Sequence, residues 1–514
     1  MVKRKLYFTR DTLSSDKKKS KKFRVKTSIL LMKLRRQTSF KMAFVSLIIL
    51  LILSVISLTL TASTENIAIE DFFIAFIALS ISLFSTLIVL IKDIINSITE
   101  FNGSFIIENS ETKSKIMKNV SSTEEYKKKG YEWKDYNGEN KYETSDVINK
   151  FLVSTNFSEH KKNLKLALKD TQKKFIIPTE SLRALDHRAK ESFQKNEILF
   201  NSNLIRLSND ILNINGETLY LGKTDFFSHV STNYCLYDSI RKYNDVDYQY
   251  DGYRFALKSS DIKNLDSIEF NNLKDSYCAN SIGMSTLAVT KDGKIVVLIQ
   301  GKTNESRGRL VPSGSGSAEY STLKKNYGDK NSFVDFITYE MSREMLEEVQ
   351  ISKENYRKIL KTNPSELTYV KNNKLDDINI KEVYDINNYH HKTYLIGYCR
   401  FLHRSGKPDF YGITKLDVDS SILKDYFNAY VQRVKSDEEK NETENAFFIG
   451  KLNVDSPYES LLKQTSDNVI SLQLKYIIDE LVKIKKNPSD YLDYNDKEIE
   501  EQKEFLELVN SFFE

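Results

Sequence analysis

Cysteine is scarce in this chain of 514 residues, which contains only Cys235, Cys278 and Cys399. The number is odd, the spacing is wide, and no two cysteines form a C-x-x-C pair. A disulfide framework and a zinc site are therefore not expected, because both need cysteines in pairs or clusters. The pattern fits a protein that folds in a reducing cytoplasm.

Acidic residues are almost missing from the first part of the chain. Residues 1–41 hold fifteen Lys or Arg against Asp11 and Asp16, a net charge of +13. The whole chain has a net charge of +5, so the other 473 residues together carry −8. The basic character belongs to a tail, which argues against a body that binds a DNA or RNA polymer. With 40% hydrophobic and 29% charged residues, the remainder is expected to be globular, with room for two or three folded units.

Charged residues are also absent from two long apolar runs, residues 42–62 and 72–91. Each run is about long enough to cross a ~30 Å hydrocarbon layer as a helix. The connector at residues 63–71 has three acidic residues and no Lys or Arg. By the positive-inside rule, the tail at 1–41 is cytoplasmic and the connector lies outside, so both termini are expected in the cytoplasm. Residues 42–91 therefore predict a two-helix transmembrane hairpin.

Small and hydroxyl residues recur along one face of each apolar run. They are Ser54, Ser57 and Thr61 in the first run, and Ala75, Ala78, Ser82 and Ser85 in the second. Such a seam lets helices approach closely in lipid. It joins the two helices of one hairpin or lets copies of the chain self-associate, and the pattern leaves both open. Neither run holds a charged side chain, so an ion-selective filter is not indicated.

Proline is absent before Pro178, and residues 92–200 are rich in Lys, Glu, Asn and Tyr. We interpret this segment as a polar linker with helices. Residues 122–142, with turn signals at Gly130 and at 137–138, are expected to be a polar linker. Helices are predicted over residues 158–175 and 179–195. The segment either transmits movement to the membrane or is a passive spacer.

From residue 203 onward, short alternating runs and Asn-Gly or Asp-Gly pairs indicate strands. Residues 284–300 predict a β-hairpin around the Asp-Gly pair at 292–293. A short strand then runs into a small-residue loop at 313–317, and a helix is predicted over residues 332–351. Further downstream we expect strands at 365–370, 380–386 and 391–402, a loop at 403–416, and an amphipathic helix at 460–486. The loop makes Arg404 and Lys407 available to an anionic ligand.

The predicted helix at 332–351 combines an apolar face with glutamates at its margin. At about 100° per residue, one arc is apolar, formed by Val334, Ile337, Met341, Met345 and Val349. Glu344 and Glu347 flank this arc, and Glu348 projects into it. A carboxylate at the edge of a core needs a compensating partner, either Arg343 or a hard divalent cation. Taken alone, R-E-x-x-E-E also suits an ordinary solvated helix face.

The order of hairpin, strand, glycine-rich loop, helix with R-E-M-L-E-E and further strands resembles the Nudix family. The family's box, G-x5-E-x7-R-E-U-x-E-E-x-G-U with U a bulky aliphatic residue, is matched by Arg343, Glu344, Met345, Glu347, Glu348 and Ile351. In that family the three glutamates hold Mg²⁺ against a substrate diphosphate, and the arginine braces loop and helix. The resemblance implies an α+β Nudix-like domain with α-β-α layers at residues 201–514. It also implies Mg²⁺ as cofactor, with Glu344, Glu347 and Glu348 as ligands.

The chain departs from this box at two positions. Gln350 stands in place of the glycine, and Asp335 in place of the upstream glutamate. The loop before the helix also differs, since the expected Pro-Gly-Gly is replaced by V-P-S-G-S-G-S-A-E. Hydrolysis is therefore left open.

Two apolar spans ahead of a cytoplasmic Nudix-like domain resemble the two-transmembrane Nudix effectors of bacterial CBASS antiphage systems. The stretches N-S-I-G-M-S-T-L-A-V-T, G-R-L-V-P-S-G-S-G-S and G-K-P-D-F-Y-G-I-T-K-L carry this likeness. It implies a multi-pass protein of the bacterial inner membrane that binds a cyclic nucleotide made by a cognate nucleotidyltransferase. The hairpins would then multimerise, disrupt the lipid bilayer and abort the infection.

On this hypothesis six residues contact the ligand, namely Arg309, Ser313, Gly314, Ser315, Gly316 and Arg343. The alternative is a membrane-tethered, Mg²⁺-dependent Nudix hydrolase of nucleoside diphosphate–X substrates, with Glu347 and Glu348 catalytic. A third possibility is an anchored scaffold without a ligand.

Overall fold

The computed structural model describes most of the chain. The described residues are 15–34, 40–49, 52, 56, 69–136, 138, 140–158, 160–168, 175–194, 201–242, 245–258, 266–300, 308–321, 323, 332–349, 391–424, 427, 443–465, 468–492 and 498–514. Most of the first predicted span, and the predicted strands at 365–370 and 380–386, lie outside these ranges.

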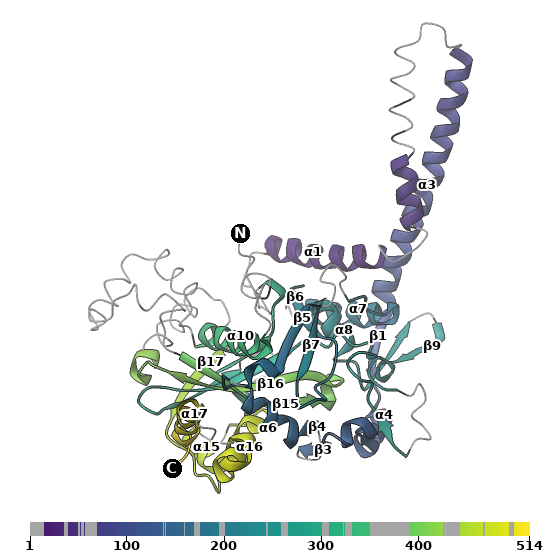
Figure 1. Cartoon of the computed structure of the whole chain (residues 1–514). Helices are drawn as coiled ribbons and strands as arrows, with labels where there is room; N and C mark the ends of the chain where they lie inside the picture. Colours follow the sequence, from purple (N-terminus) through teal and green to yellow (C-terminus); the bar gives the residue numbers. More distant parts are fainter. Residues whose placement is uncertain are drawn as a thin grey trace, which may run out of the picture.

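A long helix, α3 (Ile69–Gly103), rises out of the folded body, and α1 (Ser15–Leu34) crosses its base (Figure 1). The predicted span at 72–91 lies within α3, but the helix extends beyond it by twelve residues, to Gly103. Among the described residues one helical stretch, Ser80–Thr99, is long and apolar enough to cross a membrane, and 11% of it is buried. Residues Phe40–Ile49 form a shorter apolar helix.

The body is built on a nine-stranded mixed sheet with the order β13-β12-β11-β16-β15-β4-β3. The remaining two strands, β14 and β17, pair with β11 and β12. Only the central pairing of β11 with β16 is parallel. The strand bounds are β3 Tyr131–Tyr136, β4 Asn140–Ser145, β11 Gly283–Val289, β12 Ile295–Gln300, β13 Leu310–Val311, β14 Gly314–Ser317, β15 His391–Phe401, β16 Lys407–Leu416 and β17 Thr443–Ile449.

The predicted hairpin forms β11 and β12, and Gly293 in its turn has a φ of +74° that suits glycine. The two strands pair with each other only at Ala288–Val296 and Val289–Ile295, so they fork. The chain returns into this fork, where β13 pairs with β12 and β14 pairs with β11. The small-residue stretch 313–317 was predicted to be a loop, and this prediction is wrong because it lies largely within β14.

Helices cover both faces of this sheet (Figure 1). On one face, α16 (Leu472–Lys486) and α17 (Ile499–Ser511) pack on side chains such as Ile396 and Tyr411. On the other face, α10 (Phe333–Glu348) packs with Leu395 and Phe410. The alternation of Leu395 and Ile396 follows from the period of two in a strand. The sheet is therefore the middle of three layers.

Three smaller sheets flank the large one. Their orders are β1-β8-β9, β10-β2 and β5-β7-β6. The strand bounds are β1 Ser104–Glu108, β2 Val120–Ser121, β5 Leu164–Leu168, β6 Asn203–Leu207, β7 Glu217–Asp225, β8 Asp238–Lys242, β9 Asp245–Asp251 and β10 Ile268–Glu269. The remaining α-helices are α4 Ser110–Asn119, α5 Glu124–Lys127, α6 Asp146–Ser154, α7 Thr179–Gln194, α8 Phe226–Thr232 and α15 Pro457–Thr465.

Several sequence predictions are wrong in instructive ways. Residues 92–200 are not a linker, because β3 and β4 extend the large sheet through the pairing of β4 with β15. The helix predicted at 158–175 is instead a 3-10 turn followed by β5, whereas the helix at 179–195 is confirmed as α7. The loop predicted at 403–416 contains β16, in the middle of the sheet. The single helix at 460–486 is two, α15 and α16.

Buried ion pairs join α1, α7 and β8 below the long helix. Lys33 of α1 pairs with Asp186 of α7, and both side chains are almost fully buried. Two residues further along α7, Arg188 binds Asp238 of β8 at 2.9 Å. Burial raises the pKa of Asp238 to about 6, although Arg188 opposes the shift. Since α3 leads directly into β1, which pairs with β8, these contacts tie the base of α3 to the body.

Candidate functional site

The glutamate-bearing helix α10 begins and ends close to the predicted positions. The Ser332 hydroxyl caps its start by accepting from the Asp335 amide at 3.2 Å. The predicted apolar arc is confirmed, because all five of its members are buried. The helix ends at Glu348, so the matched positions 343–348 all lie on it, while Ile351 lies outside the described residues.

Glycines of β14 let α10 lie directly on the strand. A Cβ atom on Gly314 would stand 2.4 Å from the Cα atom of Met345. One on Gly316 would stand 2.6 Å from the carboxyl carbon of Glu344. Real Cβ atoms do not approach so closely, so the two glycines are needed for this packing. The side of α10 that bears Glu344 and Met345 therefore packs directly on the strand.

Arg343 lies among three carboxylates of its own helix. Its Nη2 atom is 3.0 Å from Glu340 Oε2 and 2.7 Å from Glu344 Oε1, and its Nη1 atom is 2.9 Å from Glu347 Oε1. Glu340 and Glu344 are buried, whereas Glu347 is about one third exposed. Burial disfavours the charged guanidinium, but the three carboxylates outweigh it and raise the pKa of Arg343. The guanidinium therefore stays charged, and it balances the charge of one of the three carboxylates.

The carboxylates do not fit a Mg²⁺ ion in this arrangement. Glu344 and Glu347 direct oxygens to Arg343, which takes the place that a cation would need. Within the described part of the chain no group of three or more His, Cys, Asp or Glu side chains is placed to hold a metal. A magnesium site at Glu344, Glu347 and Glu348 therefore stays a prediction, and no step of a mechanism is drawn through it.

The six predicted ligand residues have different roles. Ser313 is buried, and its hydroxyl accepts from the Ala288 amide at 2.7 Å and donates to the Val296 carbonyl at 2.5 Å. Gly314 is covered by α10. Glu344 contacts both Gly316 and Arg343, so these two predicted ligand residues lie close to each other. Ser315 is half-buried. Arg309 is exposed just before β13. Burial raises the pKa of the Tyr136 phenol, and the positive charge of Arg309 opposes this rise. Ser313 and Gly314 thus have packing contacts, and their contact with a ligand stays a prediction.

A second group of charges meets the far end of β14. Arg404 Nη1 is 3.4 Å from Asp409 Oδ2, and Lys407 Nζ is 3.5 Å from Asp409 Oδ1. Lys407 also donates to Ser317 Oγ at 3.4 Å. Both cations were predicted on an open loop, but Lys407 is buried and Arg404 largely so. An anionic ligand here has to compete with Asp409.

Two contributors to these clusters were missed from the sequence. Glu340 accepts from the Glu319 amide at 3.2 Å as well as from Arg343, so it fixes the chain after β14 to α10. Asp409 needs Gly283 opposite it, since a Cβ there would stand 1.5 Å from its Oδ1 atom. No local pattern indicates the contact of Glu340 with the Glu319 amide or that of Asp409 with Gly283.

Arg400 on β15 forms the most deeply buried charge network. Its Nη1 atom is 3.4 Å from Glu143, 3.9 Å from Asp210 and 3.1 Å from the Tyr126 hydroxyl. Burial raises the pKa values of Glu143 and Asp210, and Arg400 opposes both shifts. Perturbed groups often mark active sites. Here the guanidinium also donates to the Gly406 carbonyl, so the network clamps β15 to the surrounding strands and loops.

No protein-family model matches the chain, and no curated protein matches its sequence. The assignment of a function therefore rests on the residues themselves.

Proposed function

We propose that the chain is a membrane-bound effector of a CBASS-type antiphage system in the inner membrane of a bacterial cell. Its Nudix-like cytoplasmic domain binds a cyclic-nucleotide messenger made by a cognate nucleotidyltransferase. Binding promotes multimerisation of the apolar hairpin, and the disrupted membrane ends the infection. Lipid and other copies of the chain are the further partners.

One observation carries this proposal: α3 continues without a break from its exposed apolar stretch into the folded body. Large apolar side chains are exposed along it, namely Ile77, Ile81, Phe84, Leu87, Ile88, Ile91 and Ile95. Such a contiguous apolar surface is costly in water and favourable in a bilayer. Because α3 continues into β1 at Ser104, a change in the body has a direct covalent route to the membrane segment.

The face with small residues supports self-association. Ala78, Ser82 and Ser85 are exposed in the single chain. The Ser85 hydroxyl donates to the Ile81 carbonyl at 2.9 Å, so its polar group is satisfied within the helix. A second copy can therefore pack on this face without leaving the Ser85 hydroxyl unpaired in lipid.

The charges around β14 support binding rather than hydrolysis. Two of the three carboxylates that a Nudix hydrolase uses for Mg²⁺, those of Glu344 and Glu347, are paired with Arg343. At the other end of the strand, Arg404 and Lys407 share Asp409, and a messenger phosphate can replace that carboxylate. Such an exchange gives the ligand different affinities for two arrangements of the domain, which a population shift requires.

Dye release from liposomes tests the proposal. The full chain is reconstituted into vesicles loaded with a self-quenching dye, and a panel of cyclic dinucleotides and trinucleotides is added. We expect at least one messenger to release the dye while its linear hydrolysis product does not. A Lys407→Gln variant should lose the response, and the matched exposed change Lys451→Gln should keep it. Thermal unfolding checks that both variants fold.

The hydrolase alternative gives the opposite pattern in the same preparation. It predicts Mg²⁺-dependent cleavage of a nucleoside diphosphate–X substrate that the double variant Glu347→Gln, Glu348→Gln abolishes, with no dye release. Turnover of this kind, or no dye release with any messenger, refutes the effector proposal. If no nucleotide shifts the unfolding temperature either, the anchored scaffold remains.

A further inference from the structure

The crossing of α1 and α3 lies where the apolar surface of α3 ends (Figure 1). Ile95 and Ile98 are still exposed there, below Lys92, the first charged residue after the apolar stretch. At 1.5 Å per residue, Ile98 is about 9 Å below Lys92, at the outer edge of a headgroup layer that extends about 5–8 Å beyond the hydrocarbon. If α3 spans the membrane, α1 therefore lies next to the lipid headgroups.

One side of α1 is held by the body. Val25 and Ile29 are buried in a core with Phe101 of α3 and Leu185 of α7. Lys33 on the same side is paired with Asp186. This side fixes how the helix is rotated and leaves its opposite side outward.

The outward side of α1 is basic, with an apolar residue among the charges. Arg24, Ser28 and Leu31 are exposed, at spacings of four and three residues that place them on one face. By the same periodicity, positions 17 and 21, both lysines, share this face. A basic face that includes a large apolar side chain is typical of a helix lying in a membrane interface.

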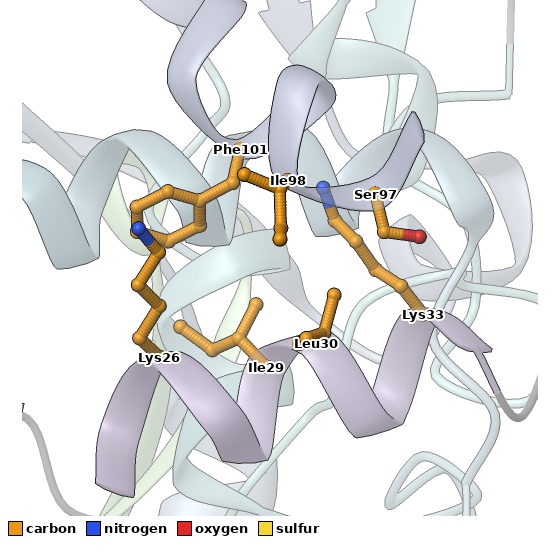
Figure 2. A pocket seen from close by; sticks show the side chains of 7 residues that line it. All are labelled: Lys26, Ile29, Leu30, Lys33, Ser97, Ile98 and Phe101. Atoms are coloured by element: carbon orange, nitrogen blue, oxygen red, sulfur yellow. The ribbon is translucent and has the colours of Figure 1, made fainter. Parts of the chain in front are cut away.

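A small groove lies between α1 and α3 on the held side of α1 (Figure 2). It is lined by Ile29, Leu30, Lys33, Ile98 and Phe101, and it has room for about one water molecule. Lys26 lies at one end, with its ammonium 5.1 Å from the centre of the Phe101 ring. The groove is too small for a lipid chain, so the outward face is the side of α1 left for the membrane.

We propose that the outward face of α1 docks on anionic phospholipids of the membrane that α3 spans. The lipid phosphates pair with Arg24 and the lysines of this face, and Leu31 packs against the apolar part of the lipid. The occupant is anionic because this part of the chain has a net charge of +13 in residues 1–41. This inference rests on the proposed membrane anchorage but not on the nucleotide messenger. Docking would fix the body against the bilayer.

An environment-sensitive fluorophore on α1 measures docking in the full chain. Ser28→Cys supplies an exposed thiol for an NBD label, and the three native cysteines are buried. The labelled protein is placed in nanodiscs of phosphatidylcholine alone or with 30% phosphatidylglycerol. We expect brighter, blue-shifted emission in the anionic discs and its loss in 1 M salt, where the Debye length falls to about 3 Å.

Charge variants make the test specific. Arg24→Gln with Lys21→Gln should lower the ratio of docked to undocked chains by roughly 30-fold, equivalent to about 1 kcal/mol per basic side chain near an anionic surface. The matched pair Lys451→Gln with Lys463→Gln, exposed at the opposite end of the body, should leave emission unchanged.

Equal emission in both lipids, or in both double variants, overturns lipid docking. So does a signal that arises in zwitterionic discs only when RNA is added, since the basic face then belongs to a nucleic acid. Washing membranes at alkaline pH separates the two proposals. A chain that stays in the membrane without a lipid-dependent signal refutes docking alone, whereas a chain that washes off refutes anchorage as well.

Discussion

The cluster around Arg343 yields a prediction whose magnitude follows from its burial. Arg343→Met keeps most of the side-chain length and removes the charge. Glu340 and Glu344 would then be buried next to each other without their cation, while Glu347 reaches solvent. Removing one partner of a buried ion pair costs about 3–5 kcal/mol. Since Glu347 is partly screened by water, we expect the lower half of that range.

Thermal unfolding of the purified chain measures this cost. A cooperative unit of roughly 400 residues has an unfolding entropy of ~0.8 kcal/mol/K, so the expected loss corresponds to a fall in Tm of about 4–5 °C. The fall should be smaller near about pH 4.5, because protonation then removes the charge of the carboxyl groups that have lost their partner. Mg²⁺ should not change the Tm of the unmodified chain, because Arg343 fills the cluster.

Arg309→Met is the matched control. It makes the same chemical change at an exposed arginine, and its effect should stay within about 0.5 kcal/mol. The reasoning fails if both variants lose equal stability, or if the Arg343 variant is as stable as the parent at pH 7.5. A marked rise of the parent Tm with Mg²⁺ would show that the carboxylates can release the arginine for a metal.

Three further predictions test the packing of the body. Gly314→Ala should destabilise the chain by about 1–3 kcal/mol, because the added Cβ atom would meet the backbone of Met345. Hydrogen exchange should rise in α10, and Ser315→Ala in the same strand serves as the control. Asp238→Asn should flatten the pH dependence of stability. The pKa of Asp238 in the folded state is about 6, above the ~3.9 of an exposed Asp, even with Arg188 alongside. The stabilisation that comes from protonated Asp238 is therefore full below about pH 4, and roughly 3 kcal/mol of it is lost as the pH rises through 6. Ser145→Ala removes the cap of α6 and should cost about 1 kcal/mol, measured as a fall in Tm; an unchanged Tm would show that another donor or water replaces it.

Elements with a strong local period were predicted well from the sequence. The hairpin of β11 and β12, the helices α7 and α10, and the strand β15 each combine a clear repeat with turn or cap residues. In α10 the burial of the apolar arc and the marginal position of Glu344 followed from the helical period alone. These features depend on residues close in sequence.

Elements whose polar residues are satisfied by distant partners were missed. The strand β16 begins with Lys407 and Asp409, which look like loop residues until they pair with each other and with Ser317. In β14, small residues suggested a loop, but their small size is what lets α10 pack directly on the strand. The compensation is tertiary in both cases, so a local pattern cannot show it. The pairing of Arg343 with glutamates of its own helix, in contrast, is local, and the sequence offered it as one of two possibilities.

Because α3 joins β1 directly at Gly103 and Ser104, the rotation of the body about the helix axis depends on the length of α3. One residue inserted near the end of α3 would turn β1 by about 100° around the helix axis and shift it by ~1.5 Å. Seven inserted residues would leave it within about 20° of its original azimuth. If torsion passes between the two parts, a series of insertions should make the response oscillate with the turn of the helix instead of declining steadily with length.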